Sequence, residues 1–400
     1  MRTSVFSLLA TGLLCGASAT ATAADFPAWR HLSSKNGDLP EPNGGKEQTA
    51  CLVGDIDKDG LNDIVIAERS QAPAVVWLRW TAQGWTKYVV EEDKVPIAAG
   101  GTLCDVDGDG DLDLVFGSPA TGSEVWWWEN PYPKYDPATS WKRHVIKNTG
   151  KGMHHDQLAG DFLGEVRPQI VSWFQGGGAL LLFRIPADPR QNSSWPTVTV
   201  ADGISRGEGL ALGDIDGDGK LDIVGGGRWF KHLGGTQFAT HMIDHAQTGG
   251  RAAVGCLKEG GHPQVVTVLG DGVGRLKWYE YSGDPRETAS WVGHDLLRVN
   301  VNHGHCLQIA DINGDGHLDI FCAEMMKWGM KTSPPDNPDA KAWIFYGDGK
   351  GNFTKTELAS GYDFHEAKLA DVNGDGRLDI VNKPFVWDTP RIDIWLNLGR

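Results

Sequence analysis

The chain has 400 residues, 40% of them hydrophobic, and a formal net charge of −15. So large an acidic excess argues against a nucleic acid partner and favours bound cations. Beyond the N-terminal leader, no apolar run is long enough to span a membrane, so we predict no membrane span.

The first 24 residues have the pattern of a secretory signal peptide. Arg2 precedes an apolar run over residues 5–14, and Ala21-Thr-Ala23 provides a cleavage site next to Ala24. Leu14 is a poor residue directly before a lipidated cysteine, which argues against a lipid anchor at Cys15. We therefore predict a periplasmic or secreted protein whose mature part is residues 25–400. Export matters, because millimolar extracellular calcium can fill weak sites that stay empty in cytosol.

Five acidic loops of one design follow along the mature chain. In the first, Asp55-Ile-Asp57-Lys-Asp59-Gly60-Leu-Asn-Asp63, acids alternate, Gly stands sixth and Asp ninth. Alternating carboxylates converge on one cation, and Gly permits the sharp turn. A β-branched run follows each loop, whereas an EF-hand requires Glu at position twelve and flanking helices. We therefore predict structural Ca²⁺ in loops between strands. The predicted calcium ligands are Asp55, Asp57, Asp59, Asp63, Asp105, Asp107, Asp109, Asp113, Asp214, Asp216, Asp218, Asp222, Asp311, Asn313, Asp315, Asp319, Asp371, Asn373, Asp375 and Asp379.

Two further copies of the unit have lost most or all of their acids. They align when Asp161 and Cys256 take the first loop position, and all seven units then reach an apolar strand residue ten positions later. Each unit has the pattern of four short strands, which predicts an all-β, seven-bladed β-propeller. The chain ends at the third strand of the last unit, while residues 29–32 resemble a spare fourth strand. We predict that this N-terminal strand closes the ring, which removes an open sheet edge.

Polar residues gather just before the innermost strands. The position six residues before each loop reads Thr49, Ala99, His155, Glu208, Gly250, His305 and His365. Chance places only about 0.2 histidines in seven positions of a chain with 13 histidines in 400 residues. Because these residues precede the inner strand and the acidic loops follow it, the two groups should lie on opposite faces. The sequence therefore predicts a polar funnel at one end of the channel.

This funnel suggests three kinds of site. His155, Glu208, His305 and His365 form a plausible ligand set for Zn²⁺ or Mn²⁺. The alternatives are metal-free His/Glu catalysis and a hydrogen-bonded structural plug. His154 or His303 would serve as a catalytic base, and Arg206 or Arg251 would bind substrate. Loops returning to the same face add candidate carbohydrate-binding residues, although each Trp could instead pack within a blade. These candidates are Trp173, Gln175, Arg228, Trp229 and Lys383.

The repeated Asp-x-Asp-x-Asp-Gly-x-x-Asp unit resembles the FG-GAP/VCBS repeat of integrin-type propellers. The segments Trp128-Glu-Asn-Pro, Met153-His154-His155-Asp156 and His303-Gly-His305 are similar to the propeller domains of the aldos-2-ulose dehydratase family. That resemblance implies elimination of water from a keto-sugar in a metal-containing propeller. Seven-bladed polysaccharide lyases perform related chemistry on uronates.

The resulting functional prediction is a secreted carbohydrate-active lyase or dehydratase that performs β-elimination on a keto-sugar or a uronate-containing saccharide. The competing interpretation is a non-enzymatic glycan- or protein-binding propeller of the lectin or adhesin type, and a scaffold role is the weakest. A carbohydrate is the expected ligand. The sequence leaves the oligomeric state open.

Overall fold

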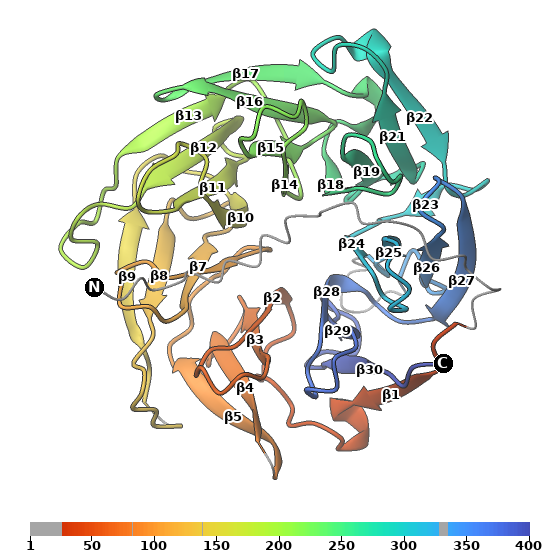
Figure 1. The fold of residues 1–400 in the computed structure, drawn as a ribbon. Coiled ribbons are helices and arrows are strands. Elements are labelled where there is room, and N and C mark those ends of the chain that lie inside the picture. Colours follow the sequence, from red (N-terminus) through yellow and green to blue (C-terminus); the bar gives the residue numbers. More distant parts are fainter. Residues whose placement is uncertain (1–25, 82, 138, 328–334) are drawn as a thin grey trace, which may run out of the picture.

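The computed structural model describes residues 26–400 except 82, 138 and 328–334. Within these residues, seven four-stranded antiparallel sheets surround a central channel as the blades of a propeller (Figure 1). The predicted seven-bladed all-β fold is confirmed. The predicted signal peptide, residues 1–24, lies outside the described residues. No helix among the described residues is long and apolar enough to cross a membrane.

The blades follow the order of the sequence, with the innermost strand first. Blade 1 contains β2 (Gln48–Gly54), β3 (Asp63–Glu68), β4 (Val75–Thr81) and β5 (Gly84–Glu91); blade 2 contains β6 (Thr102–Cys104), β7 (Asp113–Gly117), β8 (Val125–Glu129) and β9 (Lys142–Lys147). Blade 3 contains β10 (His154–Gly160), β11 (Gln169–Phe174), β12 (Ala179–Arg184) and β13 (Thr197–Ala201); blade 4 contains β14 (Ala211–Gly213), β15 (Asp222–Gly225), β16 (Arg228–Gly234) and β17 (Gln237–Met242). Blade 5 contains β18 (Gly250–Gly255), β19 (Gln264–Leu269), β21 (Lys277–Tyr281) and β22 (Trp291–Asp295); blade 6 contains β24 (Cys306–Ala310), β25 (Asp319–Ala323), β26 (Lys341–Gly347) and β27 (Phe353–Ser360).

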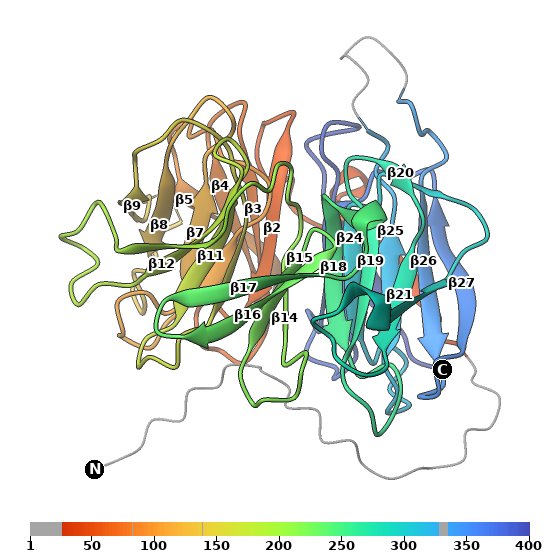
Figure 2. The same ribbon diagram turned by 90° about the horizontal axis from the view of Figure 1, so that it is seen from above.

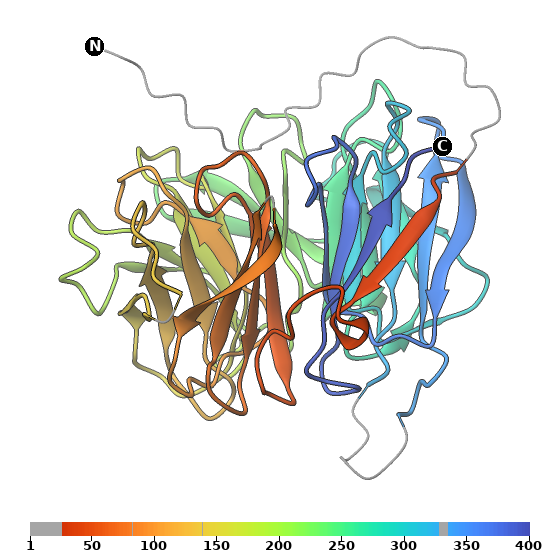
Figure 3. The ribbon, with the colours of Figure 1, turned by 90° about the horizontal axis from the view of Figure 1, so that it is seen from below.

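Blade 7 joins the two ends of the chain. Its strands are β28 (His365–Ala370), β29 (Asp379–Lys383), β30 (Asp393–Asn397) and, outermost, β1 (Trp29–Ser33). β1 pairs with β30 from Trp29 opposite Asn397 to Ser33 opposite Asp393, and Figure 3 shows the two strands side by side. The predicted closing strand is therefore confirmed. Two short strands, β20 (Val273–Gly274) and β23 (Val301–Asn302), pair outside the blades, and three 3₁₀ turns cover Ser34–Asn36, His245–Gln247 and Thr288–Ser290.

The core consists of layers between neighbouring blades. Each blade packs its two faces against the two neighbouring blades, so the middle strands of a blade bury side chains on both faces. In β8, the adjacent residues Trp127 and Trp128 point to opposite faces and both are fully buried. Viewed from the side, the blades stand next to one another with their connecting loops at the two ends of the channel (Figure 2). These two ends carry different chemistry.

Candidate functional site

The acidic loops share one hydrogen-bonding frame. The first carboxylate of each accepts backbone N–H groups from inside the loop, as Asp55 does from Asp59 and Gly60, both at 3.0 Å. The ninth residue is a buried Asp whose carboxylate accepts the N–H of position two, for example Asp222 from Ile215 at 3.0 Å. Burial raises the pKa of Asp222 to about 7. In blades 1, 2 and 4, three carboxylates of the loop place oxygens within 4.8 Å of one another. Hard oxygen donors so arranged fit Ca²⁺.

The degenerate blades keep this frame without its charge. In blade 3, Asp161 still accepts the N–H groups of Gly164 and Glu165, at 2.7 and 3.1 Å. Gln169 takes the ninth position, and its amide oxygen accepts the N–H of Phe162 at 2.9 Å. Gln264 does the same for Lys258 in blade 5, also at 2.9 Å. A neutral amide therefore replaces the buried carboxylate where the other acids have been lost.

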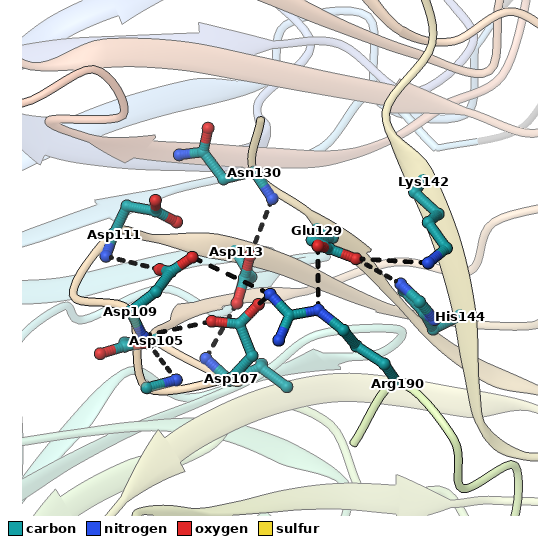
Figure 4. A network of polar contacts seen from close by, with 12 residues as sticks. Asp105, Asp107, Asp109, Asp111, Asp113, Glu129, Asn130, Lys142, His144 and Arg190 are labelled. Atoms are coloured by element: carbon teal, nitrogen blue, oxygen red, sulfur yellow. Dashed lines mark hydrogen bonds and ion pairs between the residues drawn. The ribbon is translucent and has the colours of Figure 1, made fainter. Parts of the chain in front are cut away.

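Blade 2 carries the most elaborate loop. Arg190, from the loop between β12 and β13 of blade 3, forms an ion pair with Asp107 and bonds Glu129 at 2.9 Å (Figure 4). Arg79 in blade 1 and Lys231 in blade 4 contact the third-position acids Asp57 and Asp216 in the same way. Each third-position Asp thus has a basic partner.

At the other end of the channel, the inner strands β2, β10 and β28 begin with a β-bulge. In two of them the bulge holds an acid, Asp156 in β10 and Glu366 in β28, in a left-handed backbone conformation with φ of 45° and 65°. Such conformations are costly for residues other than Gly and are concentrated at functional sites. Both bulged carboxylates are buried and line the channel. They lie in blades 3 and 7.

Arg251 in β18 joins these two blades across the channel. Its guanidinium bonds Glu366 at 2.7 Å and lies 3.5 Å from Asp156, and one of its nitrogens lies 3.4 Å from His305 Nδ1. Burial alone would lower the pKa of Arg251, but the two carboxylates outweigh it and raise the pKa. Arg251 is thus a buried ionic hub, and its Nε has no hydrogen-bond partner among the described residues. Its predicted role in substrate binding stays a prediction.

The neighbouring His155 forms a dyad with Asp156. Nδ1 of the ring lies 2.6 Å from an Asp156 oxygen that also accepts the N–H of Gly209 at 2.8 Å. Gly209, with φ of 64°, must be glycine here, since a Cβ would lie 2.7 Å from Arg251 Cα. Burial would lower the pKa of His155, but the Asp156 carboxylate raises it to about 9. At neutral pH, His155 is therefore an imidazolium.

A second acid–imidazole group lies beside this dyad. Glu208, Asp271 and His305 each place one potential ligand atom within 4.8 Å of the others. His305 Nε2 lies 3.1 Å from Asp271, and Glu208 Oε2 is buried without a hydrogen-bond partner among the described residues. Burial raises the pKa of Glu208 to about 8. Asp271 is nearly half exposed, at 46%, and marks the side open to solvent.

Asp271 is the site residue that the sequence analysis missed. It lies in the short loop after β19, between Gly270 and Gly272, at the funnel end of blade 5. The signal was present, because an Asp flanked by glycines in the loop joining the second and third strands belongs on the polar face. Because blade 5 lacks the acidic repeat, the pattern of alternating acids does not point to this loop.

His365 and His303 complete the group of funnel histidines. The His365 ring stacks on His305 with centroids 4.7 Å apart, and its Nδ1 contacts the buried Lys383 ammonium, which also donates to the Gln48 carbonyl at 2.8 Å. Burial lowers the pKa of Lys383 to about 7. Burial likewise lowers the pKa of His303 to about 4, and its Nδ1 has no partner among the described residues. His303 is therefore neutral at physiological pH.

A small cavity continues the channel behind these groups. It has a volume of about 150 Å³, and its lining includes Asp156, Arg251, His305, Glu366 and Lys368. Its lining is polar and charged at this end of the channel.

Several predicted site residues lie elsewhere. His154 is fully buried and stacks on Phe174 at 4.7 Å, so it packs in the core of blade 3 rather than facing the funnel. Trp173 and Trp229 are also fully buried, and their indole N–H groups donate to the carbonyls of Gly209 and Pro285 at 3.0 and 3.2 Å. They cannot stack on a sugar. The prediction failed because these strands bury both faces.

The remaining candidates stay near the funnel. Gln175 donates to the Gly207 carbonyl at 2.9 Å, Arg228 donates to the Gly226 carbonyl at 2.8 Å, and both are partly exposed. Arg206 is exposed, with φ of 59°. Lys383, by contrast, is fully buried. Arg206 and Arg228 are thus the predicted cationic residues that a substrate could reach.

The predicted Zn²⁺ or Mn²⁺ ligand set does not fit this arrangement. Arginine has no acceptor atom, so Arg251 must donate to His305 Nδ1, and the ring proton then lies on Nε2, facing Asp271. Below its pKa of about 7, the Lys383 ammonium imposes the same tautomer on His365. A metal-binding imidazole needs a bare nitrogen and usually donates its other N–H to an acceptor. Of the four predicted ligands, only His155 has that environment, through Asp156.

Comparison with known proteins supports the repeat and the fold. The family model of the FG-GAP-like repeat matches residues 311–381. The chain is 28% identical over 287 residues to aldos-2-ulose dehydratase of Phanerodontia chrysosporium, a match that covers 60% of this chain. It spans 29% of that enzyme's length. This chain is thus related in sequence to a carbohydrate-active dehydratase.

Two solved structures are similar to this chain over most of its length. BBS1N, determined in complex with ARL6DN, superposes with a TM-score of 0.55 at 12% identity, covering 93% of this chain and 98% of that one. Rhamnogalacturonan lyase YesW gives a TM-score of 0.46 at 14% identity, covering 94% of this chain and 75% of that one. At such identities the likeness to BBS1N concerns the fold alone.

Proposed function

We propose that the protein is a carbohydrate-active lyase that performs β-elimination on a keto-sugar or a uronate-containing saccharide by metal-free acid–base chemistry. The observation that carries the proposal is the contrast between two funnel imidazoles: His155 pairs with buried Asp156 at 2.6 Å, whereas His303 Nδ1 has no partner among the described residues. His155 is charged beside Asp156, while His303 is neutral. Sites that push the pKa values of two titratable groups apart are suited to paired acid–base catalysis. The sequence relative with a dehydratase name supports the same class.

The two histidines divide the proton transfers. Neutral His303 removes the proton on the carbon next to the carbonyl or carboxylate, and the electron pair of that C–H bond forms the new C=C bond. The C–O bond at the β carbon breaks as the His155 imidazolium protonates its oxygen. The products are an unsaturated sugar and water, or an unsaturated sugar and the shortened saccharide. The net reaction needs no oxidant.

The carboxyl pair and the exposed arginines would orient the substrate. Glu208, neutral at pH 7, and Asp271 offer a donor and acceptors to sugar hydroxyls at the solvent side of the site. Arg206 and Arg228 lie on the same face and could hold a uronate carboxylate in a bidentate pair.

The acidic loops and the N-terminal leader complete the proposal. The loops of blades 1, 2, 4, 6 and 7 would hold Ca²⁺ through carboxylate, amide and backbone oxygens, which stabilises the ends of the blades. The leader would direct the protein to the periplasm or the exterior, where calcium is abundant.

The test is a screen of keto-sugars and uronate oligosaccharides for an unsaturated product absorbing in the ultraviolet. Wild type is compared with His303→Gln and His155→Gln. The matched control is His294→Gln, which removes an imidazole paired with Glu280 on the outer strand of blade 5. We expect losses of about 100-fold or more in both funnel variants and none in the control. Saturable sugar binding without product would replace the enzyme with a lectin-like propeller.

A further inference from the structure

Two stacked histidines each have a buried cation next to their Nδ1 atom. Arg251 faces Nδ1 of His305, and Lys383 faces Nδ1 of His365. The two rings lie 4.7 Å apart with an angle of 28° between their planes. All four residues are buried, at 8% exposure or less. A guanidinium and an ammonium only donate, so each ring must accept at Nδ1 and keep its proton on Nε2.

From this geometry we propose that Arg251 and Lys383 are positioning residues that fix His305 and His365 as a pair of neutral Nε2–H donors for a developing oxyanion. The inference rests on the proposed elimination, in which the carbonyl or carboxylate oxygen gains negative charge. Neutral imidazole N–H groups held in place serve this purpose in enzymes that form enolates. The pair would thus stabilise the negative charge that the predicted metal ion was expected to stabilise.

The surroundings hold Arg251 rigidly in this role. Asp156 and Glu366 bind its guanidinium from blades 3 and 7, at 3.5 and 2.7 Å, and both sit on β-bulges in left-handed conformations. Lys383 is fixed from the other side by the Gln48 carbonyl of blade 1 at 2.8 Å. Residues of blades 1, 3, 5, 6 and 7 therefore meet at the two imidazoles. His305 Nε2 is directed toward Asp271 at the solvent side, where a substrate oxygen would enter.

The experiment reads the tautomers directly. Full-length protein labelled with ¹⁵N-histidine is examined at pH 6.5 by long-range ¹H–¹⁵N correlation, with His305→Gln and His365→Gln used for assignment. We expect the Nε2–H tautomer at both rings in wild type. Arg251→Met should abolish the preference at His305, and Lys383→Met should abolish it at His365. Arg275→Met, which removes a surface arginine paired with Asp295 in the same blade, should change neither. If Arg251→Met does not fold, Arg251→Lys replaces it, since the shorter chain keeps the charge but loses contact with His305.

Zinc titration of the same proteins provides the second readout. If the tautomers are fixed as proposed, His305 contributes nothing to zinc binding. Wild type and His305→Gln should therefore bind the same amount of zinc. One equivalent of zinc lost in that variant, or Nδ1–H tautomers in wild type, would overturn the inference. The tautomer result does not depend on any substrate, so failure of the sugar screen alone would defeat the proposed function and the oxyanion role that rests on it, but not the positioning of the two rings by Arg251 and Lys383. With an active substrate, His305→Gln should lower kcat about 100-fold with little change in KM.

Discussion

The two ends of the channel solve the same electrostatic problem in different ways. At the loop end, each intact unit carries more carboxylates than basic partners, and its oxygens suit an external cation. At the funnel end, buried carboxylates are balanced by the protein's own cations, because Arg251 bridges Asp156 and Glu366. This arrangement supports the metal-free chemistry proposed above, because His305 and His365 face Arg251 and Lys383 at Nδ1. The comparison teaches that the number of acids does not by itself predict a metal centre.

Calcium removal should produce the largest effect and act on the loop end alone. Each loop saturated at 100 times its Kd contributes about 2.7 kcal/mol to the free energy of unfolding, so chelation should lower Tm by many degrees. Differential scanning calorimetry with calcium and with a chelator measures the shift. Asp214→Asn should reduce the calcium-dependent part, whereas Glu208→Gln should leave it intact. An unchanged Tm after chelation would remove calcium from the proposal.

Loss of the internal cation should produce the next largest effect. Arg251→Met removes the cation shared by two buried carboxylates, which keep only His155 and Lys368 as basic partners. Breaking a buried ion pair typically costs about 3–5 kcal/mol. Arg275→Met breaks an exposed pair with Asp295, which is worth about 0–1 kcal/mol. Urea denaturation in saturating calcium compares the two variants. Equal free energies of unfolding for the two variants would mean that the ion pairs of Arg251 stabilise the fold no more than an exposed ion pair does.

The loop end was predictable from the sequence because its information is local. Nine consecutive residues define each unit, and their spacing repeats closely enough to count seven blades. The predicted closing strand, residues 29–32, is part of β1 (Trp29–Ser33). The ninth-position Asp and its Gln substitutes keep one frame, so even the degenerate blades 3 and 5 were placed correctly.

The funnel end was predictable only in part because its geometry is not local. Counting back from each loop identified His155, Glu208, His305 and His365, which do gather at one end. The bulges at Asp156 and Glu366 break the regular register, so equal offsets no longer give equal orientations. Neither the bulges nor the partners of Arg251 leave a mark in a single sequence. The tautomers, and with them the case against the metal, follow from those partners.

The pH dependence of the metal-free protein sharpens the comparison at one carboxylate. Burial raises the pKa of Asp222 to about 7, from an unfolded value of about 3.9. Its contribution to stability is therefore fully present below about pH 4 and is lost as pH rises through 7. In a chelator, Asp222→Asn should gain stability relative to wild type between pH 4 and 8. Thermal melts across that range measure the gain, and saturating calcium should reverse its sign at pH 8. A pH-independent difference would show that Asp222 is not protonated in the metal-free fold.

The smallest expected effect concerns a histidine that neighbours the funnel in sequence but belongs to the blade core. His154 is neutral in the folded protein because burial lowers its pKa to about 3, while in the unfolded chain it titrates near 6.5. Its contribution to stability is present above pH 6.5 and is lost as pH falls toward 3. His154→Phe keeps the stacking on Phe174, so stability at pH 7 should change by no more than about 1 kcal/mol and turnover should not change. Below pH 6, the variant should become progressively more stable than wild type in thermal melts. A loss of turnover in a stable His154→Phe protein would show that His154 contributes to catalysis although it packs in the core of blade 3.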